Sequence, residues 1–217
     1  IPYWQVIIGA LFAIVVVKCL FGGLGCNLVN PAIAARVLML VSFGSMVESV
    51  FPNGVDATSS ATALPTLMAG GEVSILDLFL GNIGGAIGET CKLALLIGFV
   101  YLIVRRVITW HIPVVFIGSV FVLSFLFNGF DPYSALLMTL SGGVFLGAIF
   151  MTTDYVTSPY TAWGRVIFGF GAALITVMIR FWGNYPEGVS YAILFMNILS
   201  PYIEKLCTKK PFGKVGK

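Results

Sequence analysis

The loop Asp56–Pro65 carries the residues best suited to take a covalent modification. It reads Asp-Ala-Thr-Ser-Ser-Ala-Thr-Ala-Leu-Pro and lies between two long apolar segments. Thr62 offers a hydroxyl that can form an ester bond. Its neighbours Ser59, Ser60 and Ala61 are small enough for a bulky group to approach. On composition alone, however, an ordinary turn rich in Ser, Thr and Asp is the better explanation of this loop.

A second set of polar residues precedes the next apolar segment. Gly22 and Gly23 permit a close backbone approach, while Asn27 and Asn30 offer amide donors and acceptors for the polar edge of a ring-shaped ligand. The same residues could do no more than start a helix, with Asn30 as the N-cap and Pro31 at the first helical position. The residues alone favour the helix start.

Acidic side chains lie near the ends of apolar segments. Asp154 and Glu204 fall at one expected boundary of the membrane, and Glu48 and Glu89 lie toward the other. A carboxylate inside a membrane is costly to bury and therefore points to function, whereas one at a boundary can simply reach water. These four acids are candidates for an ion pathway, and those at a boundary carry less weight.

The elements that must position these residues are apolar helices. Hydrophobic residues make up 59% of the 217 residues and charged residues 10%, with a mean hydropathy of +1.01. This composition indicates an all-α integral membrane protein, with residues 1–217 forming a single transmembrane domain. About seven apolar segments are long enough to cross the bilayer. They are residues 4–20, 32–50, 76–104, 112–127, 132–150, 164–181 and 187–204.

Two of these segments contain helix breakers. Segment 76–104 is too long for one span and carries four glycines between positions 81 and 88, and segment 132–150 contains Ser141-Gly142-Gly143. We expect both helices to be broken, as is tolerated where backbone lines a cavity or a cofactor instead of lipid. A glycine–asparagine turn precedes a helix both after Phe21 and after Phe181, which would suit an inverted repeat.

The basic residues predict the orientation. Arg105, Arg106, the lysine-rich tail after Lys205 and the loop 21–31 fall on one face, which the positive-inside rule makes cytoplasmic. The loop 51–74 with Thr62 then lies on the outer face. A net charge of +3 is too small to indicate nucleic-acid binding. The four cysteines show no CxxC spacing, so no metal or iron–sulfur site is expected within this chain.

The chain resembles the D subunit of the Rnf complex and, more distantly, the B subunit of the sodium-pumping NADH:quinone reductase. The matching residues are Gly22–Ala32, Asp56–Thr62, Met151–Asp154 and Asn197–Glu204, which are spread over nearly the whole chain. Two positions depart from the family: Ser60 stands where glycine is usual, and Ala63 where proline is frequent. The first few membrane helices of the family are absent from this sequence.

The resemblance implies a set of cofactors and partners. FMN would be attached to Thr62 through a phosphoester bond, with Asp56 helping to position the loop for a flavin transferase. Riboflavin would bind noncovalently near Gly22, Gly23, Asn27 and Asn30. Asp154 and Glu204 would take part in cation transfer. The partners would be the other membrane and peripheral subunits of the complex, including a second flavoprotein and iron–sulfur subunits.

The resulting hypothesis is a multi-pass subunit of the cell (inner) membrane, with its C-terminus in the cytoplasm. It would pass electrons between ferredoxin and NAD, coupled to Na⁺ or H⁺ translocation. NADH oxidation would belong to partners, because the chain has no dinucleotide-binding GxGxxG segment in a strand–turn–helix context. The quinone-reducing relative remains an alternative. So does a secondary transporter or channel, which broken helices would also suit.

Overall fold

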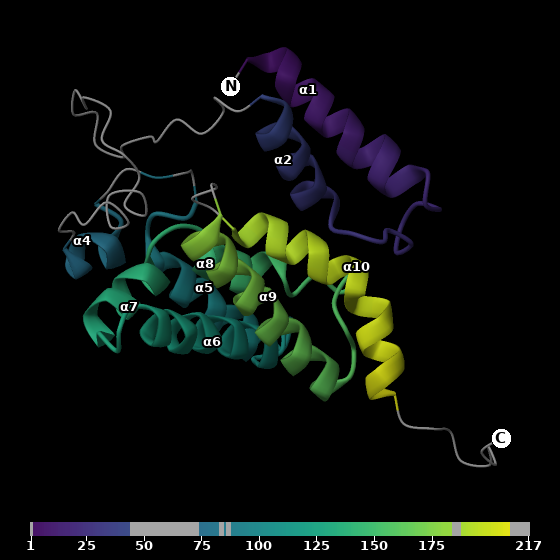
Figure 1. The fold of residues 1–217 in the computed structure, drawn as a ribbon. Helices are drawn as coiled ribbons and strands as arrows, with labels where there is room; N and C mark the ends of the chain where they lie inside the picture. The colour runs from purple at the N-terminus through teal and green to yellow at the C-terminus, as the bar shows by residue number, and fades with distance from the viewer. Residues whose placement is uncertain (1, 44–73, 83–84, 86–87, 184–187, 209–217) are drawn as a thin grey trace, which may run out of the picture.

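The computed structural model describes residues 2–43, 74–82, 85, 88–183 and 188–208, and every regular element in these ranges is a helix (Figure 1). The predicted all-α class is thereby confirmed for this part of the chain. In chain order the elements are α1 (Tyr3–Leu11), η1 (Phe12–Cys19), α2 (Pro31–Ser42), α4 (Ile75–Leu80), α5 (Lys92–Val104), α6 (His111–Phe127), α7 (Pro132–Leu140), α8 (Val144–Leu146), η2 (Gly147–Met151), α9 (Ala162–Trp182) and α10 (Val189–Cys207).

Several helices begin where a polar side chain can cap them. The carboxylate of Asp131 accepts hydrogen bonds from the N–H groups of Tyr133 and Ser134, and Pro132, which has no N–H, is the first residue of α7. The Thr161 hydroxyl accepts from the Gly164 N–H at the start of α9. These bonds satisfy backbone donors that have no partner within the helix.

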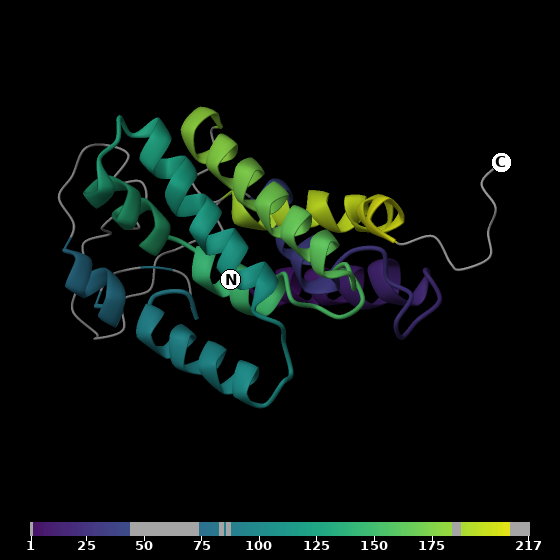
Figure 2. The ribbon, with the colours of Figure 1, turned by 90° about the horizontal axis from the view of Figure 1, so that it is seen from below.

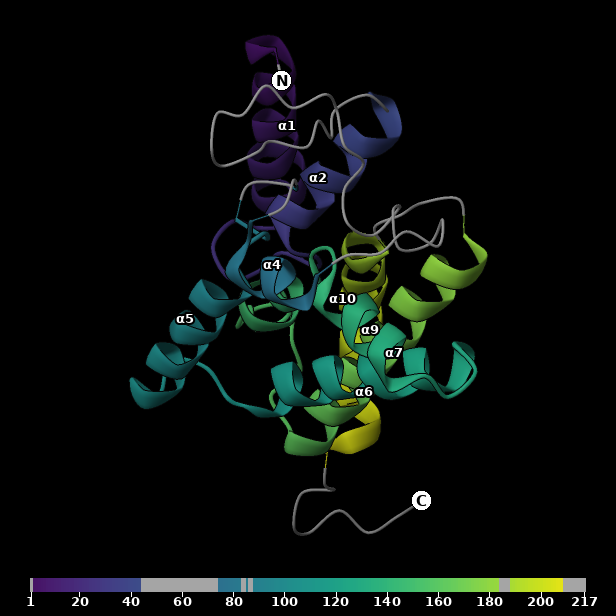
Figure 3. The ribbon, with the colours of Figure 1, turned by 90° about the vertical axis from the view of Figure 1, so that its left-hand side faces the viewer.

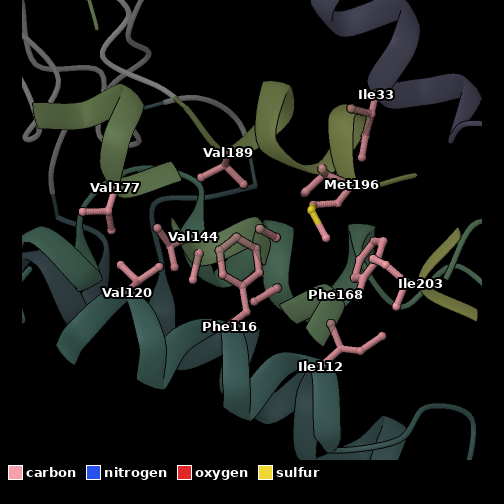
Figure 4. Packing of buried hydrophobic residues seen from close by; sticks show 14 residues of the cluster. Ile33, Ile112, Phe116, Val120, Val144, Phe168, Val177, Val189, Met196 and Ile203 are labelled. Atoms are coloured by element: carbon pink, nitrogen blue, oxygen red, sulfur yellow. The ribbon is translucent and has the colours of Figure 1, made fainter. Parts of the chain in front are cut away.

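The core lies between α6, α9 and α10. Phe116 of α6 and Phe168 of α9 are fully buried, and Met196 of α10 packs beside them (Figure 4). Seen from below, α6 and α9 run side by side, with α10 on one flank and α5 on the other (Figure 2). Helices α1 and α2 form a pair at one end of the molecule, where α2 contacts α10 (Figure 3). A second cluster joins α4, α5 and α7 around Leu78.

Both predicted helix breaks are confirmed. In place of one helix over 76–104 the structure has the short helix α4, which ends at Gly81 with a φ of +86°, and α5, which starts only at Lys92. In place of one helix over 132–150, α7 ends before Gly142, whose φ is +66°, and the following helix α8–η2 is bent from it by 64°. Positive φ angles of this size favour glycine, so the sequence marks both break points.

The number of membrane crossings remains a prediction. Within the described ranges, α9 is the helix whose length and hydropathy suit a membrane span, and α7 with α8–η2 adds a second if the bent pair counts as one. Four further apolar helices in these ranges are shorter, with 10–17 residues each. Predicted segments 32–50 and 187–204 also run into residues outside the described ranges. The inverted repeat likewise stays a prediction.

Candidate cofactor-binding pocket

The predicted attachment loop lies outside the described residues. This applies to Thr62 and to the other positions of its motif, Asp56, Ser59, Ser60 and Ala61. The loop 51–74, of which only Ser74 is described, therefore stays a prediction in both its structure and its side of the membrane.

The turn between η1 and α2 has the backbone that its glycines predict. Gly22, Gly23 and Gly25 have φ angles of +112°, +88° and +80°, in the region where other residues are strained. The turn ends at Asn30, whose Oδ1 accepts hydrogen bonds from the N–H groups of Ala32 at 3.0 Å and of Ile33 at 3.4 Å. The helix-start interpretation of Asn30 is thus confirmed, and its side-chain oxygen is occupied by α2.

A pocket opens between this turn and the C-terminal helix. It has a volume of about 280 Å³ and is formed by three segments that are far apart in the sequence. The turn contributes Asn27, the loop after η2 contributes Thr157, and α10 contributes Asn197. The remaining lining residues are Phe21, Gly25, Cys26, Leu28, Val156, Ser200 and Pro201. Of the four residues predicted to hold riboflavin, Asn27 lines this pocket, whereas Gly22, Gly23 and Asn30 shape the turn behind it.

Asn197 is the most unusual side chain of the pocket. It is 1% exposed, and neither its Oδ1 nor its Nδ2 has a hydrogen-bond partner within the described part of the chain. Pro201 lies four residues later in α10 and has no N–H, so it cannot donate the helical hydrogen bond to the Asn197 carbonyl. Buried polar groups in folded proteins are almost always paired. Asn197 therefore lies in the pocket wall with an unpaired side-chain amide and with a backbone carbonyl that lacks its usual helical N–H partner.

Asn27 is partly satisfied within its own turn. It is 8% exposed, and its Nδ2 donates to the carbonyl of Val29 at 3.0 Å. This bond fixes the orientation of the amide and leaves the carbonyl oxygen Oδ1 with capacity to accept a hydrogen bond. Asn27 and Asn197 thus bring one oriented and one unpaired amide to the same pocket.

The two predicted ion-pathway acids both contact the loop beside this pocket. Asp154 accepts a hydrogen bond at Oδ2 from the hydroxyl of Thr157 at 3.0 Å, and Thr157 is itself a lining residue. Glu204 of α10 reaches the other end of the loop. Its Oε2 accepts from the N–H of Tyr160 at 3.1 Å, and from the N–H and hydroxyl of Thr161 at 3.5 and 3.3 Å.

The structure thus gives each acid an anchoring contact. The Asp154 carboxylate touches the pocket through Thr157, and Glu204 ties α10 to the loop. The second oxygen of Glu204, Oε1, is buried without a hydrogen-bond partner among the residues described. This oxygen therefore keeps its capacity to accept a further hydrogen bond or to contact a cation.

Reasoning from the sequence assigned no role to Asn197, Ser200 or Thr157. A usable signal is present in α10, where Asn197 and Ser200 share one face of a largely apolar stretch and Pro201 follows directly. No such signal marks Thr157, because its place in the pocket depends on how the loop folds against α10.

The broken helices and the polar pocket within an apolar helical bundle are features of membrane proteins that hold a ligand between helices. Comparison with known proteins narrows this class. Residues 1–213 match the model of the NQR2, RnfD, RnfE family, an integral membrane family, and the chain belongs to it.

Curated relatives of the chain are D subunits of ion-translocating complexes. The chain is 45% identical to the D subunit of the Na(+)-translocating ferredoxin:NAD(+) oxidoreductase complex of Acetobacterium woodii, with 98% of this chain and 67% of the relative covered. It is 40% identical to the proton-translocating counterpart of Clostridium ljungdahlii, over 98% and 70%. It is 36% identical to the D subunit of the ion-translocating oxidoreductase complex of Stutzerimonas stutzeri, over 98% and 71%. The predicted resemblance to the D subunit is thereby confirmed.

Proposed function

We propose that this chain is the D-type subunit of an ion-translocating ferredoxin:NAD oxidoreductase and holds two flavins. FMN is bound covalently to Thr62, and riboflavin is bound noncovalently in the pocket between the turn 21–30 and α10. The family and the relatives support the complex and the membrane location. The single observation that carries the pocket assignment is the buried, unpaired amide of Asn197.

The pocket residues suit one edge of a flavin ring. That edge alternates carbonyl acceptors with an N–H donor, and the amides of Asn27 and Asn197 can match both kinds of group. Leaving a buried polar group unpaired costs about 1–3 kcal/mol, so a ligand that completes the bonds of Asn197 recovers this free energy. The volume of about 280 Å³ is near the lower end of small-molecule sites, roughly 300–1,000 Å³, and suits part of the flavin rather than all of it.

The pocket also offers a link between electron transfer and ion movement. A flavin bound there would supply electron transfer in single or paired steps. Thr157 joins the pocket wall to Asp154 by a hydrogen bond, so a change of charge in the pocket alters the electrostatic environment of this carboxylate. Glu204 holds the other end of the same loop. In this proposal the two acids take up and release the Na⁺ or H⁺ on the cytoplasmic side, while Thr62 lies on the outer face.

The decisive experiment measures both flavins in the purified complex after co-expression with a flavin transferase. Acid extraction followed by chromatography quantifies riboflavin, and fluorescence of the denatured subunit in a gel reports covalent FMN. We expect Asn197→Leu to lose riboflavin and keep the fluorescent band. Thr62→Ala should show the reverse pattern.

Matched variants exclude general damage. Asn128 at the end of α6 also has a buried Nδ2 without a partner in the described ranges, but it does not line the pocket, so Asn128→Leu should keep both flavins. Thr58→Ala changes a second threonine of the predicted attachment loop and should keep the fluorescent band. Retention of riboflavin in Asn197→Leu would refute the pocket assignment, and absence of any fluorescent band in the unaltered protein would refute the covalent one.

A further inference from the structure

The break between α7 and α8 is occupied by a buried guanidinium group. Arg180, in the last turn of α9, is 1% exposed. Its Nη1 donates to the carbonyl of Met138 at 2.6 Å and its Nη2 to the carbonyl of Ser141 at 3.0 Å. These carbonyls belong to the C-terminal end of α7, where the helix leaves them without N–H partners and where the helix dipole is negative. A fixed positive charge therefore fills the end of this half-helix.

The break before α5 has the same arrangement with a lysine. Lys92 is also 1% exposed, and its Nζ donates to the carbonyl of Glu89 at 2.6 Å and more weakly to that of Thr90 at 3.4 Å. The chain is closely packed here, since a Cβ on Gly81 would lie 2.8 Å from the Cα of Cys91. Each break thus presents two backbone carbonyls to a buried cationic side chain.

The two breaks meet at Glu89. A Cβ built on Gly143, in the α7–α8 break, would lie 2.7 Å from Oε2 of Glu89. The same oxygen lies 3.9 Å from Nη2 of Arg36, which comes from α2. Among the described residues that make these contacts, Arg36, Lys92 and Arg180 carry positive charge and Glu89 carries negative charge. Three cationic side chains and the carboxylate of Glu89 thus come together where the two breaks meet.

Backbone carbonyls at the ends of broken helices are the groups that coordinate Na⁺ and K⁺ in transporters and channels. We propose that Lys92 and Arg180 act as tethered cations, which occupy the carbonyl positions of both breaks and prevent mobile cations from crossing the protein between the half-helices. This role goes beyond carrying flavins. It keeps the complex tight, because an ion that leaked back through this subunit would dissipate the gradient that electron transfer builds.

The competing interpretation makes Glu89 a carrier of the transported cation. The cationic side chains of Arg36 and Lys92 oppose this, because a mobile cation that binds Glu89 would have to enter beside them. The two interpretations differ in their consequences. If Lys92 and Arg180 block the breaks, loss of either cationic side chain opens a passive leak of cations. If Glu89 carries the transported cation, loss of its carboxylate stops driven transport.

The test uses the whole complex in proteoliposomes, without ferredoxin or NAD. A K⁺ diffusion potential set with valinomycin drives uptake, which is followed with ²²Na⁺ and with an internal pH dye. We expect Lys92→Ala and Arg180→Ala to raise passive cation uptake by about tenfold or more, because each removes a full charge from a poorly screened site. Arg165→Ala is the matched control. Arg165 also donates to a backbone carbonyl, that of Pro159 at 3.1 Å, but it lies outside both breaks. Vesicles with Arg165→Ala should therefore show no increase in passive cation uptake.

Chemical rescue separates occupancy of the break from general damage. Added guanidinium ion should fit the space left in Arg180→Ala and suppress its leak, with no effect on the unaltered complex. If Arg180→Ala does not assemble with its partners, guanidinium should raise the midpoint of thermal unfolding of the purified variant subunit and not that of the unaltered one.

Vesicles that stay impermeable with both alanine variants would overturn the proposal. So would a leak in Arg180→Ala that added guanidinium does not reduce. If that variant is obtained only as the purified subunit, an unfolding midpoint that guanidinium leaves unchanged would overturn the proposal as well. Loss of driven uptake in Glu89→Gln, together with tight alanine variants, would assign the cation to Glu89 instead. Flavin content, measured in the same samples, reports on the proposed function separately, because neither tethered cation lines the flavin pocket.

Discussion

Removing the carboxylate of Glu204 should release the loop that joins η2 to α9. Its Oε2 accepts one good hydrogen bond, from the N–H of Tyr160 at 3.1 Å, and two weaker ones from Thr161 at 3.3 and 3.5 Å. Hydrogen bonds to a charged group contribute about 1.5–3 kcal/mol. Because only one of the three has good geometry, we take about 2 kcal/mol for the set.

In Glu204→Ala this loss should raise local opening of the loop about thirtyfold, since each 1.4 kcal/mol corresponds to a factor of about ten. Native-state hydrogen exchange with mass spectrometry measures the change directly. The faster exchange should be confined to peptides that contain Tyr160 and Thr161, while peptides from α6 keep their protection. Exchange of the loop that is unchanged in the variant would show that these contacts do not hold it and would refute the anchoring argument.

Glu204→Gln separates anchoring from ion transfer. The glutamine keeps an oxygen acceptor for the Tyr160 N–H but loses the charge. We therefore expect loop exchange within about threefold of the unaltered protein. If Glu204 also carries the translocated cation, driven ion uptake should fall in this variant although the loop stays closed. Unchanged uptake would leave Glu204 as an anchor only.

Three further changes test the packing and the caps. Phe116→Ala, at a fully buried position between α6 and α9, should destabilise the protein by about 3–5 kcal/mol, seen as a large fall in its thermal midpoint in detergent. Gly147→Ala should cost about 1–3 kcal/mol in the same assay, because its new Cβ would lie 2.5 Å from Cγ1 of Val189; Gly118→Ala, where nothing lies within 4 Å, should cost little. Hydrogen bonds from the Ser134 hydroxyl, the Ser134 N–H and the Tyr133 N–H lower the pKa of Asp131. The stabilisation is therefore present above the unfolded pKa and is lost as the pH falls through the folded one, so unfolding midpoints of Asp131→Ala and the unaltered protein should differ at pH 7 and converge below about pH 4.

The helices and their breaks could be predicted because their determinants are local in the sequence. The length of apolar segments, the Asn30-Pro31 start of α2 and the Ser141-Gly142-Gly143 interruption each act over a few residues. The end of α4 at Gly81 is of the same kind. What these signals leave open is the number of crossings, since helix length within the described ranges falls short of a full span for most segments.

The pocket could be predicted only in part because it is made by packing. Asn27 can be identified from its turn, but Asn197 and Thr157 join it only because α10 and the loop after η2 fold against that turn. The ligand role predicted for Asn30 competes with the capping bonds that its side-chain oxygen makes. The burial of Arg180 against the carbonyls of Met138 and Ser141 likewise has no local signal, because the contact forms only when α9 packs against the end of α7.

The contact between Arg180 and the α7–α8 break also constrains how the protein is made. Met138 and Ser141 leave the ribosome well before Arg180, and until α9 arrives their carbonyls have no partner from it. Bare carbonyls are costly in the interior of a bilayer, and so is a lone guanidinium group. We therefore expect the interrupted helix and α9 to insert together, as one cooperative block from Pro132 to Trp182. A nascent chain halted before Arg180 should then remain a substrate for membrane quality control.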